Sequence, residues 1–105
     1  MNYFEVCEMK KLVDFKDDTI NANVLLKNDK NMALLIAIKE NQKMNEHISE
    51  TDAFVYILKG KIKYKVLQDD FREYTLSKGE VMKFELFVKH ELYGLEDSKV
   101  LVVRI

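Results

Sequence analysis

The stretch from Phe54 to Leu67 constrains the fold more than any other part of the chain. Phe54–Leu58 is a run of five β-forming residues, which is typical of a strand that is buried on both faces. Gly60 then allows a tight turn, and Lys61–Leu67 alternates polar and apolar residues as a half-buried strand does. The sequence therefore predicts a β-hairpin near the centre of the chain.

Short strands separated by turns are predicted along the rest of the sequence. Their spacing of about ten residues favours an antiparallel sandwich or barrel. Further strands are expected at Ile20–Lys27, Met32–Lys39, Phe71–Leu76, Val81–Phe84, His90–Tyr93 and Lys99–Ile105. Glu40–Asn45 is expected to be a polar loop leading into His47. We predict one all-β domain over residues 1–105, with an N-terminal arm or short helix at 1–18 and a barrel at 19–105.

Composition excludes several classes of function. Hydrophobic residues make up 48% of the chain and charged residues 33%, as in an ordinary globular domain. The net charge of −1 provides no basic surface for nucleic acid, and Met32–Ile38, the longest apolar run, is too short to cross a bilayer. Cys7 is the single cysteine, which excludes an internal disulfide. Charged residues stand where a signal peptide would be apolar. We therefore expect a cytoplasmic protein that binds neither nucleic acid nor membrane.

Two stretches resemble the motifs of the cupin superfamily. The first cupin motif is a glycine, five residues, His-x-His, three or four residues, a glutamate, six residues and a glycine. His47 and Gly60 stand at the separation of its first histidine and closing glycine. Asn41 replaces the opening glycine, and asparagine tolerates the positive φ that such a position requires. Ser49 replaces the second histidine, and Ala53 replaces the glutamate.

The second cupin motif has a glycine, then a proline, a histidine and an asparagine further along. Gly79 and His90 match its glycine and histidine, whereas Glu85 replaces the proline and Gly94 the asparagine. The resemblance covers the chain from about Ile20 to its end. It implies an antiparallel cupin barrel, also called a double-stranded β-helix or jelly roll.

In cupins, the two histidines and the glutamate of the first motif and the histidine of the second hold a divalent metal. Of these four ligands the chain retains His47 and His90. Two imidazoles fall short of the three protein ligands of a catalytic zinc or non-haem iron site. Glu50, in the turn after the first histidine, is the carboxylate that could swing in. We therefore favour a cavity without a cofactor, and keep a divalent metal on the two histidines as the alternative.

The resemblance also predicts the pocket. The expected ligand-binding residues are His47, Ser49, Val55, Ile57, Met82, Phe84, His90 and Leu92. They describe a mostly apolar cavity that suits a small, partly apolar organic molecule with one or two hydrogen-bonding groups.

Three functions remain open on the sequence. The first is a small cupin barrel that binds this kind of molecule without a full metal site. The second is a metal-dependent cupin enzyme of the isomerase, dioxygenase or decarboxylase type that uses His47 and His90, or an enzyme that uses them as acid and base. The third is a structural dimer with a vestigial pocket. No catalytic residue is assigned, because a fold alone does not select a chemistry.

A homodimer is expected. Met32–Ile38, Phe54–Leu58 and Val100–Val103 are apolar on both faces, yet a small barrel buries only its inward face. The arm is short and charged, so a second subunit is expected to cover the outer face, with about 800 Å² buried per partner.

Overall fold

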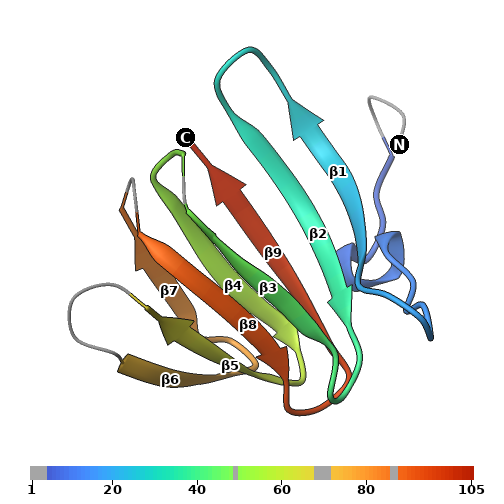
Figure 1. Cartoon of the computed structure of the whole chain (residues 1–105). Coiled ribbons are helices and arrows are strands. Elements are labelled where there is room, and N and C mark those ends of the chain that lie inside the picture. Colours follow the sequence, from blue (N-terminus) through green and yellow to red (C-terminus); the bar gives the residue numbers. More distant parts are fainter. Residues whose placement is uncertain (1–4, 49, 68–71, 86–87) are drawn as a thin grey trace.

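A computed structural model describes residues 5–48, 50–67, 72–85 and 88–105 of the chain, with the backbone alone for residues 45–48. These residues form one short 3-10 helix, η1 (Met9–Leu12), and nine strands (Figure 1). The strands are β1 (Asn21–Lys27), β2 (Met32–Ile38), β3 (Lys43–Ile48), β4 (Ala53–Lys59), β5 (Lys61–Val66), β6 (Arg72–Ser77), β7 (Val81–Phe84), β8 (Lys89–Gly94) and β9 (Ser98–Arg104). In the part of the chain described, no helix is long and apolar enough to span a membrane.

The strands form two antiparallel sheets that face each other (Figure 1). Within the described residues, one sheet has the order β1-β2-β9-β4-β7 and the other the order β3-β8-β5-β6. Side chains from both sheets meet in one hydrophobic core, where Ile57, Ile62 and Val100 are fully buried. The predicted all-β jelly-roll barrel is confirmed.

The turn at Gly60 joins the two sheets instead of closing a hairpin. β4 pairs with β7 and β9, whereas β5 pairs with β6 and β8. The hairpin prediction is therefore wrong, because a tight turn fixes the reversal of the chain but not the strand that receives the hydrogen bonds. Gly60 has a φ of 86°, and a Cβ there would collide with Ser98 Oγ and the backbone of Asp97. Both the φ and the close approach require glycine.

The chain between β2 and β3 also differs from the prediction. β3 begins at Lys43, so the second half of the predicted loop Glu40–Asn45 is strand. Asn41 has a φ of 69°, which confirms that it can replace a glycine at this turn. The reversal is complete within these few residues, so the strand starts early. The ladder between β3 and β8 then shifts register between Met44 and His47, as a β-bulge does.

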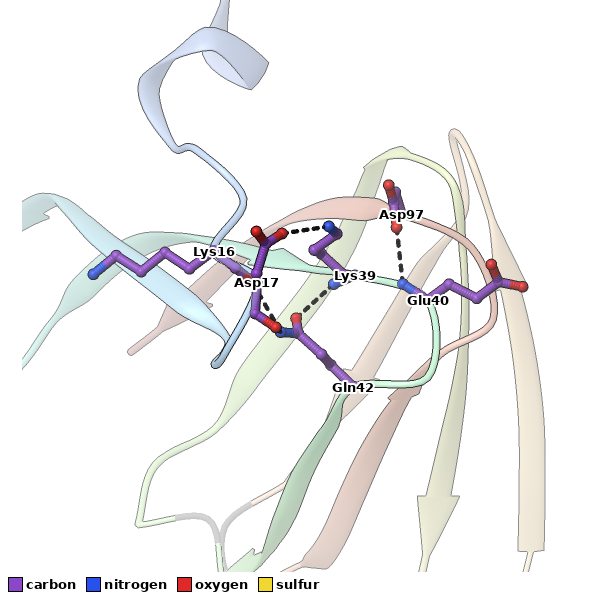
Figure 2. Close-up of polar contacts among 6 residues, drawn as sticks. All are labelled: Lys16, Asp17, Lys39, Glu40, Gln42 and Asp97. Atoms are coloured by element: carbon purple, nitrogen blue, oxygen red, sulfur yellow. Dashed lines mark hydrogen bonds and ion pairs between the residues drawn. The ribbon is translucent and has the colours of Figure 1, made fainter.

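The N-terminal arm is tied to the barrel at the same turn (Figure 2). Lys39 Nζ donates a hydrogen bond to Asp17 Oδ1 at 2.7 Å, and Gln42 Nε2 donates to the Lys16 carbonyl at 3.0 Å. Gln42 Oε1 accepts from the backbone N–H of Lys39 at 2.7 Å, so one glutamine connects the arm with the end of β2. The hydrogen bond from Lys39 holds the pKa of the Asp17 carboxyl below its usual value.

The arm also covers part of the outer face of the five-stranded sheet. Val13 is buried and packs against Leu35 and Ala37 of β2, both fully buried. Met32–Ile38 can therefore be apolar on both faces without a second subunit at this point. β4 differs, because its outward-facing Tyr56 is 37% exposed. The prediction that this strand is buried on both faces is wrong for the single chain.

Candidate functional site

A cavity of about 310 Å³ opens between the sheets, where β9 ends and β4 begins. The described residues that line it are Ile36, Met44, Glu50, Thr51, Ala53, Val55, Tyr64, Phe84, His90, Leu92, Val102 and Arg104. Both sheets contribute to its wall, which is mainly apolar.

Three aromatic rings form one wall of the cavity. Tyr64 of β5 and His90 of β8 stack with their ring centroids 5.2 Å apart and their planes 13° from parallel. Phe84, from the opposite sheet, tilts against both, with its centroid 5.7 Å from that of Tyr64 and 4.8 Å from that of His90. Aromatic pairs attract at these separations. The three rings therefore hold one another in place.

The Tyr64 hydroxyl is the unusual polar group in this wall. Its side chain is fully buried, and its oxygen has no hydrogen-bond partner among the residues described. Burial raises the pKa of this hydroxyl well above its usual value, so it keeps its proton and can donate. Leaving a buried hydroxyl unpaired costs roughly 1–3 kcal/mol. Such a group is unusual, because buried polar groups in proteins nearly always have a partner.

His90 is oriented by a hydrogen bond to its own strand. Its Nδ1 lies 3.0 Å from the carbonyl oxygen of Val88. Because a carbonyl can only accept, Nδ1 carries the hydrogen, and Nε2 holds the lone pair when the ring is neutral. His47 stands directly opposite His90 in the ladder between β3 and β8. The backbone register thus brings the two histidines together as expected, while the side chain of His47 lies outside the described part.

The mouth of the cavity carries charged and polar groups that the sequence analysis did not place there. Arg104 lines it from the end of β9, and Glu50 and Thr51 line it from the connection between β3 and β4. Arg104 continues the inward alternation of Val102 and pairs with Ala53 of β4. Alternation along the last strand was the signal that could have predicted Arg104. Glu50 and Thr51 lie in a connection, where no periodicity could place them.

The predicted ligand-binding residues fall into three groups. Those that line the cavity are Val55, Phe84, His90 and Leu92. Ile57 is fully buried in the packed core and Met82 packs against that core, and neither is part of the cavity wall described. Ser49 and the side chain of His47 lie outside the described residues. Ligand binding by any of the eight stays a prediction. Tyr64 was missed, although the alternation of Lys61–Leu67 already turned it inward.

The described side chains do not by themselves fit a divalent metal. Within the described part, no three histidine, cysteine, aspartate or glutamate residues gather where they could hold an ion. Ala53 has no donor atom, and the guanidinium of Arg104 beside it adds a positive charge to the cavity. A metal held through His47 and His90 stays a prediction, since the His47 side chain is not described.

Comparisons with known proteins concern the fold. No family model and no curated protein matches the sequence. A conserved protein of unknown function from Streptococcus pyogenes has a TM-score of 0.88 at 21% identity, covering 100% of this chain and 90% of its own. A cupin superfamily protein from Desulfitobacterium hafniense gives 0.90 at 15% identity, covering 100% and 94%. An RmlC-like cupin protein from Desulfovibrio desulfuricans gives 0.81 at 17% identity, covering 96% and 95%. The chain thus has the cupin fold.

Proposed function

We propose that this protein binds a small, partly apolar organic molecule in the cavity between its sheets. The observation that carries the proposal is a mainly apolar cavity of about 310 Å³ between the sheets, with His90 and Arg104 among the residues that line it. Pockets for small molecules are typically concave and mainly apolar, with a few polar groups that fix orientation. The rings of Tyr64, His90 and Phe84 supply a rigid surface for such a molecule.

Substitutions of His90 test this proposal, because each of its two ring nitrogens can be replaced separately. His90→Asn places an amide N–H near the position of Nδ1, keeping the bond to Val88, and removes Nε2. If the ligand uses Nε2, this variant should bind it more weakly by about 1–3 kcal/mol. His90→Gln, which instead retains a polar atom near Nε2, is the matched comparison. A ligand that binds both variants as tightly as the natural protein does not use this histidine.

An enzyme that uses His47 and His90 is the second candidate. It is favoured by the ladder register, which sets the two histidines opposite each other. Metal analysis of protein purified without an affinity tag separates the candidates. A stoichiometric divalent metal that is lost in the His90→Asn variant would favour the metal-dependent enzyme over the metal-free binder.

We also propose that two copies pair through the outer face of the five-stranded sheet. Tyr56, Val81 and Ile105 are 37%, 59% and 68% exposed, and Tyr56 and Val81 are direct neighbours on adjacent strands. Apolar side chains grouped in this way favour association. Light scattering should give a dimer at micromolar concentration, and a monomer would remove this proposal. The cytoplasmic location inferred from the sequence stays a prediction.

A further inference from the structure

Two charged residues line the cavity, as far as its wall is described: Arg104 and Glu50. Arg104 is half-buried and Glu50 is exposed. Neither side chain forms an ion pair or hydrogen bond with another described residue. A guanidinium beside an apolar cavity is less screened by water than one on an open surface, so its attraction for an anion is stronger. The cavity therefore offers one positive charge that no described residue pairs.

The backbone around Arg104 leaves room for that anion. Arg104 pairs directly with Ala53 on β4, and both residues line the cavity. Since alanine contributes only a methyl group, no side chain from β4 fills the space beside the guanidinium. The planar guanidinium can donate two parallel hydrogen bonds to a carboxylate.

The inner wall of the cavity determines which shape and polarity the rest of the ligand can have. The stacked and tilted rings of Tyr64, His90 and Phe84 favour a flat apolar group. A cavity of about 310 Å³ has room for roughly ten non-hydrogen atoms, at about 30 Å³ each.

We propose that the cavity takes a small monocarboxylic acid with a flat apolar body. This inference rests on the binding function proposed above. Arg104 binds the carboxylate, and the apolar wall packs against the flat body. Glu50 at the mouth repels further negative charge, so dicarboxylates and phosphate esters bind less well than monocarboxylates.

Matched pairs of acids and amides test the charge directly. The probes are 4-hydroxybenzoate and 4-hydroxybenzamide, together with a panel of other small acids and their amides of up to about ten non-hydrogen atoms. Dissociation constants are measured by titration with NMR detection, and shifts of the Val55 and Leu92 amides report binding in the cavity. We expect the acids to bind at least about tenfold more tightly than their amides, because a charge-assisted hydrogen bond is stronger than a neutral one.

Variants then assign the preference to one residue. Arg104→Gln should remove the preference for acids over their amides, and Arg104→Lys should retain part of it. Arg72, the other arginine of the chain, is exposed on β6 and outside the described cavity wall. Arg72→Gln is therefore the matched control and should keep the full preference.

Each outcome has a distinct meaning. Acids and amides that bind in the cavity with equal affinity, or an acid preference that survives Arg104→Gln, would overturn the carboxylate inference and leave the binding function standing. A panel in which no acid or amide shifts the cavity residues would overturn both.

Discussion

Replacing Tyr64 by phenylalanine should make the ligand-free protein more stable. The hydroxyl of this fully buried residue has no described partner, so in the free protein it loses its hydrogen bonds to water without replacement. An unpaired buried hydroxyl costs roughly 1–3 kcal/mol. Phenylalanine removes that cost and keeps the ring, which stacks on His90 at 5.2 Å and contacts Phe84 at 5.7 Å.

The expected gain is about 1 kcal/mol in the free energy of unfolding, at the lower end of this range because deleting the oxygen leaves a small void. For a domain of this size, 1 kcal/mol raises the Tm by roughly 4–8 °C.

Two other tyrosines provide controls. Tyr74, directly opposite Tyr64 on β6, is 40% exposed, so Tyr74→Phe should change stability by less than about 0.5 kcal/mol. The Tyr93 hydroxyl donates to Glu91 Oε1 at 2.9 Å, so Tyr93→Phe should destabilise the protein by about 1 kcal/mol.

The assay is equilibrium unfolding in urea at one fixed protein concentration, since any dimerisation makes apparent stability depend on concentration. The three substitutions should give a gain, no change and a loss. A clear loss of stability in Tyr64→Phe would refute the reasoning, because it would mean that this hydroxyl is satisfied in the free protein.

Two further predictions concern the scaffold. Gly79→Ala should cost roughly 1–2 kcal/mol, because Gly79 has a φ of 87° but open space around it. Gly60→Ala should cost more in the same urea experiment, since its Cβ would also collide with Ser98 Oγ, and equal losses would contradict the packing argument. The hydrogen bond from Tyr93 holds the pKa of Glu91 below its usual 4.5. The resulting stability is present above that value and is lost as the pH falls through the lower folded pKa, so Glu91→Gln should flatten the acid limb of unfolding below pH 4.5. An unchanged acid limb would show that the carboxylate is not held in this way.

The sequence predicts local conformation well because the causes lie within a few residues. Gly60, Gly79 and Asn41 all have positive φ, as glycine and asparagine allow. The alternation along the strands also predicts the inward faces, including Ala53 and Val55 of β4. The backbone conformation at these turns follows from residue type, and the inward faces follow from the alternation of side chains along a strand.

Pairing between strands could not be predicted in the same way. A tight turn at Gly60 is compatible with a hairpin or with a crossing between sheets, and the difference depends on β7, β8 and β9, which come later in the chain. Ser98 favours the crossing between sheets, because its Oγ accepts a hydrogen bond from the N–H of Lys61 at 2.9 Å. That contact spans more than thirty residues and leaves no pattern near the turn.

The charge of the cavity was missed for the same reason. Arg104 and Ala53 are far apart in sequence but directly paired in the sheet, and Tyr64 joins them in the wall from the other sheet. Taken singly, each has an ordinary explanation as the end of a strand, a small residue or a core aromatic. Together they leave a guanidinium without a described partner beside one hollow space. A chain that folds only for stability would fill the hollow, since an empty cavity raises the free energy of the folded state. A small acid that occupies the cavity and pairs with Arg104 accounts for both features, and this shared explanation is the reason to treat them as one site.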